Sequence, residues 1–192
     1  MFSLPKGEYS PNFLEFFKWS VSLAKENGKY IDVRNAQYVL SSGRCGGYCD
    51  GLGIVIAGKS KLFEKNFAHE MGHLKQIIDD SPLWVDEDWW TGSFDIPHFL
   101  KMLKLLALER DCERIVLEFN KQWKLFDEIE YIKEANSCLY SYIIRFLNRK
   151  WAISKPIYSK EILSLMPDHL VSMEEIKTFD IELIIKISKL LR

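Results

Sequence analysis

Three residues in one short stretch have the types and spacing needed for metal chemistry. His69, Glu70 and His73 form the pattern HExxH within residues 66–76. Residues four apart on an α-helix lie on one face, one turn apart, so the two imidazoles can converge on one cation. Glu70 follows the first histidine, and its carboxylate can come beside the open coordination position and take a proton from bound water. The pattern predicts two zinc ligands and a general base; the alternative is an amphipathic core helix with two incidental histidines.

A tetrahedral zinc that keeps one position for water needs a third protein ligand. The charged segment ERDCER, residues 109–114, interrupts the apolar period of a later predicted helix. Glu109 and Glu113 are one turn apart on this helix, so one can bind the metal while the other accepts a hydrogen bond from a ligand histidine. The alternative is a solvated patch of charged residues.

The elements that must hold these residues are mostly helices. Apolar spacing predicts helices over residues 11–27, about 60–78, 98–123 and about 127–150, with shorter helical segments after Ser159 and Ser172. The first helix is expected to end at Gly28, and its inward candidates are Phe13, Leu14, Phe17, Val21 and Ala24. The inward candidates of the helix over residues 98–123 include Leu103, Leu106, Ala107, Ile115 and Phe119.

Short β-prone runs at residues 30–33, 37–40 and 53–57 flank a loop rich in glycine, serine and aspartate. They predict a small sheet before the HExxH helix, and the fold class is therefore α+β and predominantly helical. If the run at 53–57 is an exposed edge beside the metal, it can hold an extended peptide by main-chain hydrogen bonds. The alternative is a buried central strand.

Composition favours one globular domain over residues 1–192, with a catalytic core at 28–123 and a helical part at 124–192. The 26 basic and 27 acidic side chains are intermixed, so nothing supports nucleic-acid binding. We find neither a signal-peptide pattern nor an uncharged apolar run long enough to span a bilayer. A soluble cytoplasmic protein without a membrane partner is expected, and its oligomeric state stays open.

Two further segments have alternative interpretations. The four cysteines are expected to be reduced thiols, although Cys45 and Cys49 could form half of a structural zinc site. The segment after Asp79 contains Trp84, Trp89 and Trp90 among acidic residues. It is either a lid that recognises basic substrates or a cap on the core.

With HEMGH followed by ERDCE, residues 52–119 resemble the gluzincin-type zinc metallopeptidases, and most of all the small intracellular branch of phage-associated and ImmA/IrrE-like proteins. The resemblance implies a zincin-like fold, with His69, His73 and Glu109 as ligands of one Zn²⁺. It implies Glu70 as the general base and Glu113 in the place of the outer-sphere aspartate. His98 competes with Glu109 and Glu113 for the third position.

The predicted activity is zinc-dependent hydrolysis of peptide bonds in a peptide or protein substrate, by a zinc-bound water that Glu70 activates. Candidate donors to the oxyanion are Tyr48, His98 and Tyr140. The alternative is a regulatory or binding protein that keeps a metal-stabilised zincin scaffold without hydrolysis. A purely structural helical domain, which would bind no metal, comes third.

Overall fold

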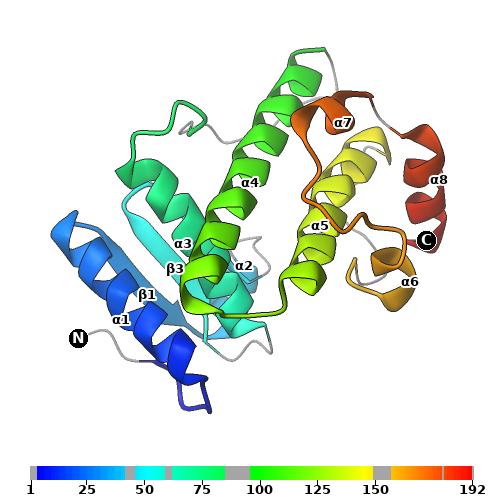
Figure 1. Ribbon diagram of the computed structural model, residues 1–192. Helices are drawn as coiled ribbons and strands as arrows, with labels where there is room; N and C mark the ends of the chain where they lie inside the picture. The colour runs from blue at the N-terminus through cyan, green and yellow to red at the C-terminus, as the bar shows by residue number, and fades with distance from the viewer. Residues whose placement is uncertain are drawn as a thin grey trace. The chain divides into compact units, whose positions relative to one another are not determined.

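The computed structural model describes residues 4–41, 46–58, 62–84, 96–148, 157–178 and 180–191. The chain forms two compact units: Met1–Asp86 with Ile115–Phe126, and Glu87–Arg114 with Asp127–Arg192. Helices predominate and one small sheet lies in the first unit, so the predicted α+β class is confirmed (Figure 1). The division into two units does not test whether residues 1–192 form a single domain, so that stays a prediction.

The first unit contains the sheet and the helix with the HExxH pattern. Its elements are α1 (Pro11–Glu26), β1 (Tyr30–Arg34), α2 (Ala36–Ser41), β2 (Gly47–Cys49), β3 (Gly53–Ala57) and α3 (Phe63–Ile78), together with the last turns of α4 (Ile96–Trp123). The HExxH helix begins three residues later than predicted and ends at Ile78 as predicted.

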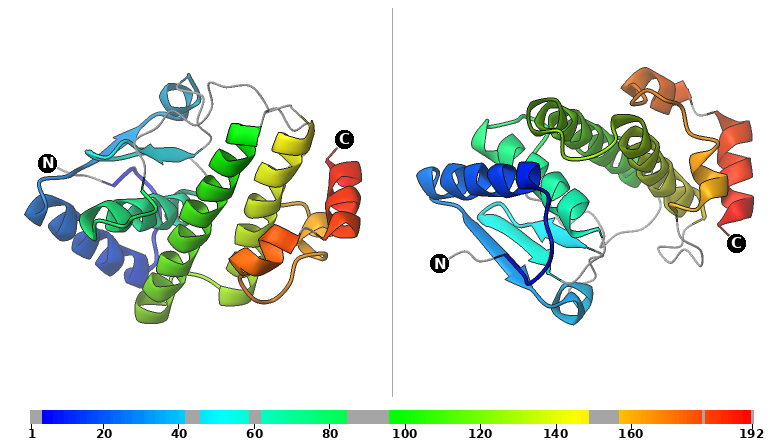
Figure 2. Two further views of the ribbon diagram at one scale, coloured as in Figure 1. Left: turned by 90° about the horizontal axis from the view of Figure 1, so that it is seen from above. Right: turned by 60° about the horizontal axis from the view of Figure 1, so that its bottom comes forward.

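The sheet has the order β1-β3-β2, in which β3 pairs in parallel with β1 and antiparallel with β2. All five residues of β3 are buried, because this strand is central and has helices on both faces. Val55 and Ala57 pack with Val39 of α2, whereas α1 and α3 lie on the other face (Figure 2). The edge prediction for residues 53–57 is therefore wrong, and the buried central strand is confirmed.

Two neighbouring segments correct the sheet prediction further. The β-prone run at 37–40 is helical, because Asn35 accepts a hydrogen bond from the backbone N–H of Tyr38 at 2.8 Å and so starts α2. Conversely, β2 lies where a loop was expected. A tight turn joins β2 to β3. Gly51 in this turn has a φ of 82°, which residues with a side chain rarely adopt.

The first helix follows its predicted limits closely, and Gly28 follows it with a φ of 65°. Ser10 caps its start by accepting from the N–H of Phe13 at 3.1 Å. The predicted inward face is partly wrong, since Phe16 is buried while Leu14 is exposed. Residues 13, 16, 17, 20 and 24 form the helical stripe that faces the core.

Aromatic packing fixes α3 within the first unit. The ring of Phe16 on α1 contacts Phe67 of α3 edge-on, with centroids 5.9 Å apart, and Phe119 of α4 at 5.3 Å. Trp19 and Trp123 extend this contact at 4.7 Å. Each buried phenylalanine contributes about 1.5–3 kcal/mol, so the packing determines how α3 presents its residues.

The second unit is helical in its described part. It consists of the first turns of α4 with α5 (Glu128–Asn148), α6 (Lys160–Leu163), α7 (Met173–Thr178) and α8 (Ile181–Leu190). Ser159 caps α6 as predicted, but the segment after Ser172 forms two helices, because Asp180 caps α8 separately. Among the predicted inward residues of α4, Leu106, Ile115 and Phe119 are buried, whereas Leu103 and Ala107 are only partly buried.

Of the helices in the described ranges, none is long and apolar enough to cross a membrane. The described residues reach Trp84 in the tryptophan-rich segment, so the prediction of a lid or cap involving Trp89 and Trp90 lies outside them.

Candidate metal centre

Successive turns of α3 bring the two predicted histidine ligands together. The ring centroids of His69 and His73 lie 4.8 Å apart with planes at 89°, and a ring nitrogen of each lies within 4.8 Å of the other. Two nitrogens bound to one tetrahedral zinc at about 2.0–2.1 Å are about 3.4 Å apart. The two rings are therefore close enough to be candidate ligands of one ion.

A buried amide is a hydrogen-bond partner of His73. The Nδ1 atom of His73 lies 2.9 Å from Oε1 of Gln76, whose side chain is 1% exposed. An amide oxygen only accepts hydrogen bonds, so Nδ1 carries the proton and donates it. In the neutral ring Nε2 then keeps its lone pair, which is the form that a metal ligand requires.

Gln76 was not predicted from the sequence. Its position three residues after His73, on the same face of the helix, was the available signal. The sequence interpretation instead assigned the role of histidine partner to Glu113. For His73, the structure gives this role to Gln76.

Glu70 is buried, and its side chain lies against Gly47 of strand β2. A Cβ atom added to Gly47 would lie 2.9 Å from Cγ of Glu70 and 2.8 Å from the carbonyl oxygen of Val55. Any other residue at position 47 would therefore collide with the backbone of β3 and with the side chain of Glu70. The absence of a side chain at Gly47 gives the candidate general base its space.

Cys49, also on β2, lies close enough to His73 and Glu70 for their charges to affect its thiol. Burial raises the pKa of its thiol to about 12, while His73 acts to lower it and Glu70 to raise it. The thiol therefore stays protonated at neutral pH in the metal-free protein. Cys45, the other half of the alternative structural zinc site, lies outside the described residues.

The side chains of β2 alternate between the two faces of the sheet. Gly47 and Cys49 belong to the face of α3, whereas Tyr48 packs with Val39 and Val55 on the face of α2. Tyr48 is therefore wrongly placed to donate to an oxyanion at the histidines. Tyr140 is buried in the core of the second unit, and the side chain of His98 lies outside the described part.

The predicted carboxylates lie on α4, in its part that belongs to the second unit. Glu109 and Glu113 are 9% and 5% exposed, so they do not form a solvated patch. The hydroxyl of Tyr131 on α5 donates to Oε2 of Glu113, and that of Tyr142 lies 3.5 Å from Oε1 of Glu109. Burial, and then Glu113, raise the pKa of Tyr131 well above its usual range, so its hydroxyl remains a donor.

One further residue on this face of α4 has a side chain that binds metals. Cys112 is fully buried and lies between the two glutamates in the helical spacing 109, 112, 113. A deprotonated cysteine is a good zinc ligand. The sequence interpretation treated Cys112 only as a reduced thiol, and the i, i+3 spacing from Glu109 was the signal that could have found it.

The structure thus brings His69, Glu70 and His73 together within the first unit. It brings Glu109 and Glu113 together within the second. The set of three protein ligands, including the choice of Glu109, stays a prediction.

Comparisons of the chain with protein-family models, with curated proteins and with solved structures gave no match.

Proposed function

We propose that this chain is a zinc-dependent metallopeptidase with a zincin-like fold of the gluzincin type. The observation that carries the proposal is the group on α3: two histidines whose ring nitrogens lie within 4.8 Å, one of them fixed in the metal-binding tautomer by Gln76. The buried carboxylate of Glu70 lies between them in sequence. A helix that only filled the core would gain nothing from this combination of buried polar groups.

The donor set suits one Zn²⁺ ion. Imidazole nitrogen and carboxylate oxygen are the ligands of catalytic zinc sites, which keep one position open. When bound, zinc would act as a Lewis acid and lower the pKa of a bound water to about 7. His69 and His73 would hold it, and the Gln76 amide would keep the ring of His73 oriented.

Glu70 is the proposed general base and acid. Its carboxylate would accept the proton of the attacking water and return it to the nitrogen of the leaving amine. Burial suits this role because a carboxylate away from bulk water has few competing proton donors. Gly47 of β2 contributes by leaving the carboxylate side chain its space.

The third protein ligand in the proposal is Glu109, and Glu113 is its neighbour in the outer sphere. This part rests on the ExxxE spacing and on the burial of both carboxylates, which are costly to bury unless they are hydrogen-bonded or bind a cation. Cys112 is the competing ligand on the same helical face.

A peptide is the proposed substrate because β2 offers an edge. Among the described strands, β2 pairs only with β3, so its second edge can accept the main chain of an extended segment. Its residues Gly47 and Cys49 lie beside Glu70 and His73, so the main chain of a bound peptide would run past the proposed catalytic group.

Glu70→Gln tests the proposal, since the amide keeps the size of the side chain but cannot accept the proton. We expect the variant to keep one equivalent of zinc by elemental analysis. We also expect it to lose hydrolysis of a quenched fluorescent peptide library by a factor of about 10²–10⁴. Glu64→Gln, two turns earlier on α3, is the control and should retain both zinc and turnover.

Three results would contradict the proposal in different ways. Unchanged turnover in Glu70→Gln would remove Glu70 as the base. Stoichiometric zinc without chelator-sensitive hydrolysis in the wild-type protein would leave the non-hydrolytic binding protein. Absence of stoichiometric metal would leave a structural helical domain.

A further inference from the structure

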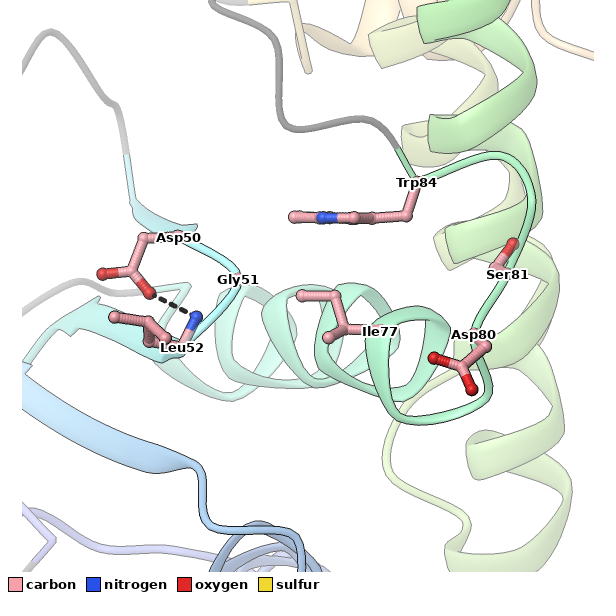
Figure 3. Close-up of a pocket in the computed structure, with 7 residues that line it drawn as sticks. All are labelled: Asp50, Gly51, Leu52, Ile77, Asp80, Ser81 and Trp84. Carbon is pink, nitrogen blue, oxygen red and sulfur yellow. Dashed lines mark hydrogen bonds between the residues drawn. The ribbon is translucent and has the colours of Figure 1, made fainter.

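A pocket of about 570 Å³ lies at one end of α3 in the first unit. Its lining comes from the β2–β3 turn, the end of α3 and the segment that follows α3: Asp50, Gly51, Leu52, Ile77, Asp80, Ser81 and Trp84. Figure 3 shows the indole of Trp84 over the pocket, Ile77 and Leu52 below it, and the carboxylates of Asp50 and Asp80 at opposite ends.

The apolar part of the lining is open to a ligand. Leu52 is 68% exposed in the turn between β2 and β3. Together with Ile77 and the face of Trp84 it forms a slot with apolar surfaces on two sides. A slot of this kind suits the methylene chain of a long side chain or a planar group that stacks on an indole.

Both ionisable groups that line the pocket are acidic. Oδ1 of Asp50 accepts hydrogen bonds from the N–H groups of Leu52 and Gly53, each at 3.0 Å, and Oδ2 accepts one from the hydroxyl of Tyr30. These donors are neutral, so they fix the Asp50 carboxylate in place without cancelling its charge. Asp80 adds a second carboxylate from a residue with a φ of 51°.

Two lysines lie near the pocket, and each has a hydrogen-bonding partner. Lys29 donates to the carbonyl oxygen of Gly51 at 2.8 Å, and Lys75 pairs with Asp79. Neither is part of the lining. The ammonium of Lys29 thus lies at the Asp50 end of the pocket, whereas the Asp80 end has no lysine among the described residues of the lining. The ionisable side chains of the lining are both carboxylates and lie beside an aromatic face, which is the arrangement that attracts a cation on an apolar stem.

Trp84 also connects this pocket to the candidate metal centre. Its ring lies 6.0 Å from the ring of His73, centroid to centroid, with planes at 61°. A side chain under the indole would therefore belong to a residue close to the bond that the centre would act on. Trp84 thus both lines the pocket and contacts one of the proposed metal ligands.

We propose that this pocket binds the side chain of a lysine or arginine in the peptide substrate, with the stem between Trp84 and Leu52 and the cation at Asp80 or Asp50. The inference rests on the proposed function for its substrate class, a peptide. It goes further by assigning a preference for basic residues, and it names the residues that create it.

The test measures binding and not turnover. Fluorescein-labelled hexapeptides that differ at one position at a time, with arginine, lysine, citrulline or glutamate, are titrated against zinc-loaded full-length Glu70→Gln protein by fluorescence polarisation. Citrulline matches arginine in shape but lacks its charge. Arginine would add an exposed ion pair and a cation–π contact that citrulline lacks, so at one position it should bind about 5-fold to 30-fold more tightly than citrulline.

Two variants in the same background assign the preference to the pocket. Asp80→Asn should reduce the arginine-to-citrulline ratio about threefold, and Trp84→Ala should weaken arginine, lysine and citrulline peptides together. Asp79→Asn is the matched control, since Asp79 lies one residue away, pairs with Lys75 and is not part of the lining. It should leave the ratio unchanged.

The proposal is overturned if the arginine and citrulline peptides bind with equal affinity at every position. It is also overturned if no peptide binds, or if Asp80→Asn leaves the ratio of the two affinities unchanged. These outcomes are distinct from failure of the proposed function. If the protein binds basic peptides selectively but does not cleave them, the proposal for the pocket stands and the proposed peptidase activity is wrong. If it cleaves peptides without a preference for basic residues, the proposed peptidase activity stands and the proposal for the pocket is wrong.

Discussion

His73 of α3 and the carboxylates of α4 are buried, whereas His69 is only partly buried, and different kinds of neighbours hold the two groups. On α3 the partner of His73 is Gln76, three residues away on the same helix. The partners of Glu109 and Glu113 are phenols of α5, which follow them by 33 and 18 residues. The first group is a local product of one helix, whereas the second requires two helices to pack.

This difference also concerns the chemistry available to each group. The Gln76 amide oxygen accepts a hydrogen bond from the N–H at Nδ1 of His73, so the lone pair of the neutral ring is on Nε2. The tyrosine hydroxyls donate to carboxylates that retain further acceptor positions. Both arrangements leave atoms that can bind a cation, and the substitutions below test whether the two groups serve the same metal.

Loss of a ligand should have the largest effect. His73→Ala and Glu109→Ala should each lower the affinity for zinc by more than the roughly 10–100-fold that loss of an outer partner costs. Elemental analysis after gel filtration, with a competing chelator, measures this directly. The histidine control is His169→Ala, because His169 is 64% exposed and pairs with Glu175.

The same measurement decides the third ligand. If Cys112→Ala lowers zinc affinity as His73→Ala does while Glu109→Ala has no effect, the thiol is the ligand and the ExxxE assignment is wrong. If none of the α4 substitutions affects the metal, the two groups are unrelated and the site on α3 takes its third ligand from elsewhere.

A smaller effect is expected from the amide that orients His73. Gln76→Leu removes the acceptor from Nδ1 while keeping the size of the side chain, so zinc affinity should fall about 10-fold to 100-fold. Gln76→Glu keeps an acceptor and should retain affinity. Lys75→Ala, one residue earlier, serves as the control for changes to this turn. Equal affinity in the leucine and glutamate variants would show that the hydrogen bond does not contribute.

The contrast between the two groups also explains what the sequence could predict. The HExxH spacing predicted α3 and the pairing of its histidines, because residues i and i+4 of a helix are neighbours in every fold. The central position of β3 was left open, because a short apolar run reads the same at an edge and in the middle of a sheet. The helix α2 was missed, because the β propensity of its residues is weaker than the cap provided by Asn35.

The hydrogen bonds of Glu109 and Glu113 could not be predicted from the sequence, for a different reason. Tyr131 and Tyr142 carry no pattern that links them to α4, and their role follows only from the packing of α5. The pocket under Trp84 depends likewise on a turn, a helix end and a loop that meet only in the folded chain. Asp86, Glu87 and Asp88 near the tryptophans suggested basic substrates, whereas the carboxylates that line the pocket are those of Asp50 and Asp80.

The smallest predicted effect concerns the carboxylate group without any metal. Tyr131→Phe removes a buried hydroxyl that donates to Glu113, so the free energy of unfolding of the zinc-free protein should fall by about 1–2 kcal/mol. Tyr142→Phe should cost less, since its hydroxyl lies 3.5 Å from Glu109, at the limit of a hydrogen bond, and the side chain is only half-buried. Urea unfolding followed by circular dichroism measures both. If Tyr142→Phe proved the more costly, Glu109 would be the more firmly held carboxylate in the absence of metal, and its oxygens would be less available to a cation than those of Glu113.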